Sequence, residues 1–157
     1  MAYIDVISLA EAKNYLRIDD IGTEDDAAIT RMINSSLRYV ETYTNVLVYD
    51  RDVDVFISEG TKRLYDYPIN TDLSTLTDYD VQKKGLYTNI CDLSGEDSTV
   101  TINMGYADPV DVPQELLEVA YEMIDLYYYG EKDGKPIAKK LSAMSMDSLN
   151  INKRFLL

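Results

Sequence analysis

The chain has 157 residues, a length typical of one domain that can bury a sizeable core. It contains 28 acidic residues, 15 basic residues and no histidine, which gives a formal net charge of −13. This balance excludes nucleic-acid binding through the average surface, because phosphate contacts depend on Lys and Arg. The missing histidine removes the usual general base and a common metal ligand.

The first segments along the chain predict two amphipathic helices. Residues 4–7 are expected to be an extended lead-in. Ser8 and Glu11 have the spacing of a capping box, which predicts a helix over residues 8–17. Thr23 and the acidic residues after it predict the start of a second helix, over residues 23–44, that ends at Asn45.

The middle of the chain changes to strand-like alternation. Residues 46–57 alternate between apolar and polar side chains, and the segments 62–67, 76–82 and 86–91 are further strand candidates. The sequence therefore predicts a small antiparallel sheet, inserted over about residues 46–106 between the second and third helices. One face of its first strand consists of Val53, Val55 and Ile57, which are expected to point into the core. The opposite face consists of Asp52, Asp54 and Phe56.

A strand over residues 100–104 leads into the longest apolar segment. Asp111 is expected to cap a helix over residues 112–129, with Pro113 in its first turn. Two apolar stripes run along this helix, so we expect it to be covered on two sides, as the spine of the core or as a subunit interface. Successive helical residues point about 100° apart, so Tyr127, Tyr128 and Tyr129 cannot all face one core.

The end of the chain has a weaker pattern. A polar stretch over residues 130–136 indicates a hinge, and residues 136–157 are expected to form a C-terminal arm that ends in Phe155, Leu156 and Leu157. Such an arm could dock on a partner protein or a neighbouring subunit. The alternative is a tail that folds back on the helices of its own chain.

The residues that could carry chemistry have simpler structural explanations. Cys91 lies in a strand-like context and is expected to be a small buried side chain, not a nucleophile. Asp50, Asp52 and Asp54 resemble the first half of a calcium loop, but Val55 replaces the required glycine and Thr61 the required glutamate. No catalytic, cofactor or metal site is therefore predicted. The 14 tyrosines, in a chain without tryptophan, favour packing in a core or an interface over base stacking.

These observations predict a non-catalytic α+β domain that belongs to an assembly. Its three-helix core (residues 8–17, 23–44 and 112–129) and inserted sheet form a domain over residues 1–135, followed by the arm. No apolar run approaches the length of a membrane span and no signal-peptide pattern is present, so no membrane association is expected. Interface candidates are Tyr121, Tyr127, Tyr128, Tyr129, Phe155, Leu156 and Leu157.

Several motifs resemble the head–tail connector family of tailed bacteriophages. The N-terminal half carries SLAEAKNYLRID at residues 8–19, EDDAAI at 24–29 and YVETYT at 39–44. The second half carries VTINMGY at residues 100–106 and VPQEL at 112–116, with LYY near the end of the long helix. The blocks occur in the family's order and cover both helical parts of the chain.

The resemblance implies a structural role in the neck of a virion that is assembled in the host bacterial cytoplasm. Such proteins form a ring of about a dozen copies beneath the portal, extend the DNA channel and provide the platform for the next neck or tail component. DNA passes through without specific binding. Under this reading, Glu24, Asp25 and Asp26 are candidates to face the channel, where acidic side chains repel DNA.

Two other classes of function remain open at the level of sequence. One is a small acidic metal-dependent enzyme or calcium module built on Asp50, Asp52 and Asp54. The other is an acidic binding module that imitates DNA and occupies a basic partner as a monomer or dimer.

Overall fold

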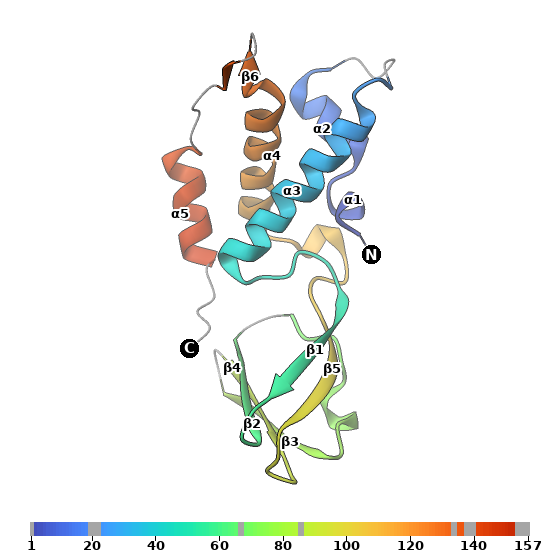
Figure 1. Cartoon of the computed structure of the whole chain (residues 1–157), viewed down its shortest axis with the longest axis vertical. Coiled ribbons are helices and arrows are strands. Elements are labelled where there is room, and N and C mark those ends of the chain that lie inside the picture. Colours follow the sequence, from blue (N-terminus) through green and yellow to red (C-terminus); the bar gives the residue numbers. More distant parts are fainter. Residues whose placement is uncertain are drawn as a thin grey trace.

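The computed structural model describes residues 2–18, 23–65, 68–84, 87–132, 135–136 and 141–152. The chain forms two lobes, with the helices gathered at one end and the main strands at the other (Figure 1). The predicted α+β class is confirmed. Among the described helices, none combines the length and the apolar character that a membrane span would need.

The first two helices are short and locally capped. The segment expected to be extended begins instead with a helical turn, α1 (Tyr3–Val6), in which the Asp5 carboxylate accepts a hydrogen bond from the Ala2 N–H at 2.6 Å. Helix α2 (Leu9–Leu16) has the predicted capping box. Glu11 donates its N–H to Ser8 Oγ at 3.2 Å and accepts from the Ser8 N–H at 2.8 Å.

Two long helices, α3 (Asp26–Thr44) and α4 (Gln114–Tyr129), form the centre of the helical lobe. Helix α3 begins three residues later than predicted and ends as predicted at Asn45, whose φ of 58° is left-handed. The expectation that Asp111 caps α4 is wrong. Asp111 belongs to a 3₁₀ turn (Pro109–Asp111) that Asp108 caps, and Pro113 occupies the cap position of α4.

The core of the helical lobe is formed mainly by the facing sides of α3 and α4. Smaller contributions come from α1, α2, the segment after α3 and the C-terminal helix that carries Leu149. The fully buried side chains of this core are Ile7, Ala12, Ile29, Ile33, Leu37, Val40, Val48, Leu116, Val119, Ala120, Ile124 and Leu149.

The β-lobe contains two sheets where the sequence predicted one. Strand β1 (Arg51–Ile57) pairs with β5 (Ser98–Met104), and β2 (Thr61–Tyr65), β4 (Tyr87–Asp92) and β3 (Tyr79–Lys84) form a second sheet in the order β2-β4-β3. Both sheets are antiparallel. Between β1 and β2 the pairing is reduced to one bridge, Ser58 with Thr61, at a turn through Glu59 and Gly60 that both have positive φ.

A shared apolar core holds the two sheets together. In β1 the predicted alternation is confirmed, because Val55 and Ile57 are buried while Asp52, Asp54 and Phe56 are exposed. Strands β2 and β4 supply Leu64 and Ile90, and β5 supplies the remaining members, Val100, Ile102 and Met104. A 3₁₀ turn (Leu73–Thr75) precedes β3.

Helix α5 (Ala143–Asn152) packs against α4 and α3, after a short hairpin of β6 (Glu131–Lys132) and β7 (Lys135–Pro136). Leu149 of α5 is fully buried in this contact. The Glu122 carboxylate on α4 accepts from the Ser142 N–H at 2.7 Å and from the Ser145 hydroxyl, so α4 caps the start of α5. Residues 143–152 therefore fold back on the helices of their own chain, which was the alternative to a free arm. Phe155, Leu156 and Leu157 lie outside the described residues.

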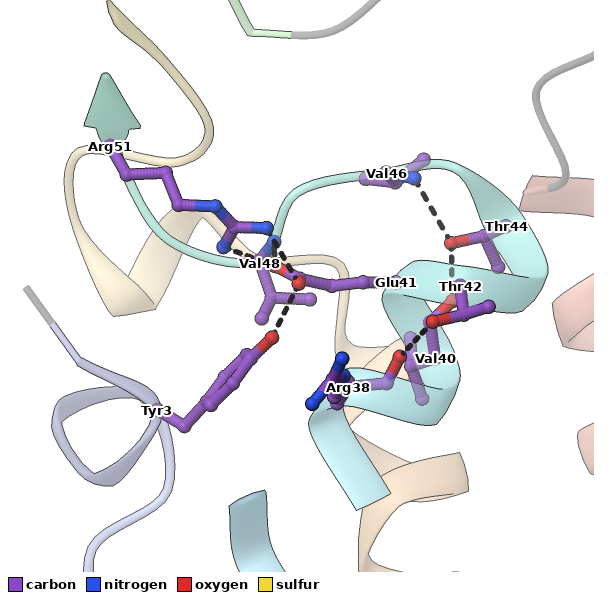
Figure 2. A network of polar contacts seen from close by, with 9 residues as sticks. All are labelled: Tyr3, Arg38, Val40, Glu41, Thr42, Thr44, Val46, Val48 and Arg51. Atoms are coloured by element: carbon purple, nitrogen blue, oxygen red, sulfur yellow. Dashed lines mark hydrogen bonds and ion pairs between the residues drawn. The ribbon is translucent and has the colours of Figure 1, made fainter. Parts of the chain in front are cut away.

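The two lobes meet at Glu41, a buried carboxylate in the last turns of α3 (Figure 2). Its two oxygens accept from the Tyr3 hydroxyl at 2.6 Å, the Val48 N–H at 2.9 Å, and Arg51 Nη1 and Nη2 at 2.9 and 2.8 Å. These donors come from α1, from the segment after α3 and from the first residue of β1. One carboxylate thus connects both lobes.

Aromatic rings surround this junction. The Arg51 guanidinium lies 4.6 Å from the centre of the Tyr49 ring, which meets the Tyr3 ring edge to face at 5.0 Å. Burial and the hydrogen bond to Glu41 raise the pKa of the Tyr3 phenol, so it remains a donor. Gly105, at the end of β5, has a φ of 113°, and a Cβ there would lie 2.0 Å from the Tyr49 carbonyl oxygen.

Replacing the junction carboxylate, Glu41→Gln, should lower the free energy of unfolding by about 2–3 kcal/mol. The amide keeps the size of the side chain but loses the charge, and its NH₂ group must face a donor. Urea unfolding followed by circular dichroism measures the effect. Thr42→Ala is the matched control: Thr42 is exposed and donates only to the Arg38 carbonyl, so a change within about 0.5 kcal/mol is expected. Equal stability of the two variants would contradict the role of Glu41 as the carboxylate that connects the two lobes.

Candidate interaction surfaces

The tyrosines at the end of α4 make contacts within the chain. Tyr128 donates its hydroxyl to Asp25 Oδ2 at 3.0 Å, just before α3, and this hydrogen bond, followed by burial, raises the pKa of its phenol. Tyr129 donates to the Leu16 carbonyl at 2.8 Å, at the end of α2. Their rings meet edge to face with centres 4.9 Å apart. The two phenols therefore fasten the end of α4 to its neighbours.

Tyr121 and Tyr127 lie on different sides of α4. Tyr121 is half-buried, and its ring stacks on Tyr15 of α2 with centres 4.9 Å apart. Tyr127 is 46% exposed and lines a shallow pocket of about 350 Å³ with four residues of α3. Its ring therefore has the accessible area that a subunit contact needs. The α3 residues of this pocket are Ala28, Arg31, Met32 and Ser35.

The three acidic residues proposed for a channel surface have different surroundings. Glu24 and Asp25 are exposed at the start of α3, although Asp25 also accepts the Tyr128 hydrogen bond. Asp26 forms an ion pair with Lys13 Nζ at 2.5 Å, and Lys13 is buried. The charge of Asp26 is thus compensated within the chain, which leaves Glu24 and Asp25 as the outward charges of this group.

The aspartates of β1 are arranged as members of a strand. Asp52 Oδ1 accepts from Asn103 Nδ2 at 2.9 Å and Asp54 Oδ1 accepts from the Thr101 hydroxyl at 2.7 Å, both across to β5. No group of three or more metal-ligating side chains is gathered anywhere in the described ranges. The geometry therefore gives the calcium or metal-enzyme alternative no support.

The prediction that Cys91 is buried is wrong. Along β4 the period of two places Ile90 in the core and Cys91 on the opposite face, where it is half-buried. The Thr61 hydroxyl lies 3.8 Å from its sulfur. The alternation of faces along a strand was the available signal, because neighbouring residues such as Ile90 and Cys91 point to opposite faces.

A groove of about 500 Å³ lies between the end of α3 and the β-lobe, and the sequence analysis does not predict it. Tyr3, Arg38 and Lys62 are among its lining residues, together with Phe56, which is 56% exposed. In the sequence, Phe56 was the available signal for this groove, because it is an aromatic residue on the otherwise polar face of β1. Apolar side chains line much of the groove, and Arg38, Asp54 and Lys62 add charges of both signs.

Comparisons with known proteins identify a matching family and solved structures with a similar fold. Residues 6–154 match the family described as "Phage gp6-like head-tail connector protein". A comparison with curated protein sequences gave no match.

Two similar solved structures come from gene transfer agent particles. One, "Neck of empty GTA particle computed with C6 symmetry", contains a chain that is 14% identical, with a TM-score of 0.69 over 97% of this chain and 91% of that one. The other, "Virion of native gene transfer agent (GTA) particle", contains a chain that is 15% identical, with a TM-score of 0.70 over 100% and 94%. At this identity the likeness shows a shared fold.

The family match covers almost the whole described chain and includes both helical blocks that carry the motifs. The resemblance inferred from those motifs is thereby confirmed. The chain belongs to the phage gp6-like head–tail connector family.

Proposed function

We propose that this chain is a structural subunit of a virion neck that closes into a ring between the portal and the tail. The ring extends the DNA channel and provides the platform for the next neck or tail component. The observation that carries this proposal is the family match over residues 6–154. The shared fold with a chain of a gene transfer agent neck supports it.

The shape of the subunit suits a ring. Repeated head-to-tail contacts need two different surfaces on each copy, and they close when the rotations add up to a full turn. The Glu41 junction fixes the helical lobe against the β-lobe, so all copies present these surfaces in the same relative orientation. A rigid subunit is what a closed assembly of about a dozen identical copies requires.

Native mass spectrometry of the purified protein, alone and with the portal, tests the ring directly. We expect a discrete assembly of about a dozen copies, formed by the protein itself or on the portal, and visible as rings in negative stain. A chain that remains monomeric or dimeric in both preparations would contradict the proposal. Salt-sensitive capture of a basic partner by such a monomer would instead favour the DNA-imitating module.

Within this ring, the acidic start of α3 faces the channel. Glu24 and Asp25 are exposed there, in a chain with a net charge of −13. Negative charge along a channel repels phosphate, so DNA slides without binding. Asp26 contributes less because its charge is paired with Lys13.

Reversal of these charges, Glu24→Lys with Asp25→Lys, should slow or block DNA release from assembled particles. Lysines along the channel would bind the passing phosphates, and the delay should shrink as salt is raised. The control pair, Asp80→Lys with Glu96→Lys, makes the same charge change at exposed positions of the β-lobe and should release DNA at the normal rate. Normal release from the Glu24/Asp25 variant would contradict the channel assignment.

The last residues of the chain, Phe155, Leu156 and Leu157, form the tip of an arm that holds the subunit on the portal or on a neighbouring copy. The apolar composition of this tip, which follows Lys153 and Arg154, supports the assignment. Helix α5 is docked on its own chain, so the contact belongs to the terminal residues beyond it.

Deletion of residues 155–157 should abolish incorporation into particles, because the apolar anchor is lost. The isolated truncated protein should unfold at the normal temperature, since these residues follow the docked α5. Particle composition by gel or mass spectrometry gives the first readout and thermal circular dichroism the second. Lys153→Ala with Arg154→Ala keeps the apolar tip and should incorporate. Normal incorporation of the truncated chain would show that the arm is not needed.

A further inference from the structure

The exposed side of α3 is positively charged, in contrast to the rest of this acidic chain. Arg31 and Arg38 lie two turns apart on that side, with the exposed Asn34, Ser35 and Thr42 around them. The only acidic residues of α3 are Asp26, paired with Lys13, and Glu41, buried against Arg51. We call Arg31, Asn34, Ser35, Arg38 and Thr42 the basic face.

The outer side of α4 has the opposite charge. Glu115, Glu118, Glu122 and Asp125 follow one another at spacings of three, four and three, which places all four on one stripe. Helix α4 carries no Lys or Arg from Gln114 to Tyr129. Glu115 and Glu118 are exposed, whereas Glu122 is engaged with the start of α5. We call these four residues the acidic face.

The two faces point in different directions. Helices α3 and α4 pack on each other through fully buried side chains, among them Ile33 and Leu37 of α3 and Leu116 and Ile124 of α4. Figure 1 shows α3 lying across α4. Because each helix buries the side that meets the other, the basic and acidic faces lie on opposite sides of the helical lobe.

Each face also has an apolar feature that its counterpart lacks. Beside the basic face, the pocket of about 350 Å³ is lined by Arg31, Met32 and the exposed ring of Tyr127. Beside the acidic face, the Tyr15 ring is 44% exposed and stacks on Tyr121. Burial and the nearby carboxylates of Asp125 and Glu118 raise the pKa of Tyr15, which places this ring among the acidic residues. One face therefore offers a ring and the other a hollow.

We propose that the acidic face of one copy docks on the basic face of the next. The partner is a second copy of this chain, because the two surfaces are complementary in charge and lie on opposite sides of one subunit. The contact is head-to-tail and so generates a ring. This inference rests on the ring proposed above and adds which surfaces meet. Charge pairs at the rim steer the encounter of the two copies and set their register. The Tyr15 ring beside the acidic face meets the pocket beside the basic face, and this contact excludes water.

Charge reversal tests the pairing of the faces. Arg31→Glu with Arg38→Glu, or Glu115→Lys with Glu118→Lys, should raise the concentration needed for assembly by about tenfold or more, because like charges then meet. A chain that carries all four changes should assemble again, since both faces are reversed together. Lys83→Glu with Lys84→Glu alters two exposed cations of the β-lobe and should leave assembly unchanged. Failure of the fourfold variant, although it is folded by circular dichroism, would count against the pairing.

Cross-linking gives a second readout that needs no charge change on the basic face. In a Cys91→Ser background, one preparation carries Ser35→Cys and another Glu118→Cys. Mixed at high concentration, they should give a covalent heterodimer with a short bismaleimide. Either preparation alone should give little product, because a head-to-tail contact does not bring a position next to its own copy.

The outcomes separate this inference from the proposed function. If rings form but residues 35 and 118 do not cross-link, the inference is wrong and the ring proposal stands. If these positions cross-link only to their own copies, the contact is symmetric and a head-to-tail ring through these faces is excluded. If they cross-link to each other while no closed ring forms with the portal, the contact is real and the ring proposal fails.

Discussion

The structure depends on one buried carboxylate. Glu41 lies near the end of α3 and receives hydrogen bonds from Tyr3, Val48 and Arg51, which belong to three different segments. A buried charge without partners costs several kcal/mol, so the segments that carry the donors must come together around it. The helical lobe and the β-lobe are held in one relative orientation as a result, and this orientation decides where every surface of the subunit points.

Polar side chains that resemble interface residues in the sequence also hold the helices together. Tyr128 bonds to Asp25, Tyr129 to the carbonyl of Leu16, and Lys13 pairs with Asp26. These contacts leave a smaller and more definite set of outward groups. On the two long helices, the outward charges are divided by sign: Arg on α3, Glu on α4 and acidic residues at the start of α3. Such a division suits a subunit that meets copies of itself on two sides and DNA on a third.

Most elements could be predicted from the sequence, because their signals are local. The Ser8–Glu11 capping box, the left-handed end at Asn45 and the alternation of Val53, Val55 and Ile57 all involve residues within four positions of each other. Where two local signals competed, the prediction failed. Asp108 and Asp111 are both acceptable caps by residue type, but Asp108 caps the 3₁₀ turn to which Asp111 belongs, and Pro113 occupies the cap position of α4. Whether Cys91 or Ile90 faces the core depends on the register of β4, and its pairing with β2 and β3 decides that register.

The sequence by itself determined helices α2, α3 and α4, the strand-rich segment, the excess of negative charge and the motifs of the family. Only the tertiary structure decided which charges and tyrosines remain outward, that the strands divide into two sheets, and that α5 docks through its own Leu149. The contacts that decide these points join residues far apart in the chain: Tyr3 and Glu41 are 38 positions apart, and Tyr129 and Leu16 are 113 apart. No local periodicity records such pairs, because they form only when separate elements pack and each buried polar group finds its partner.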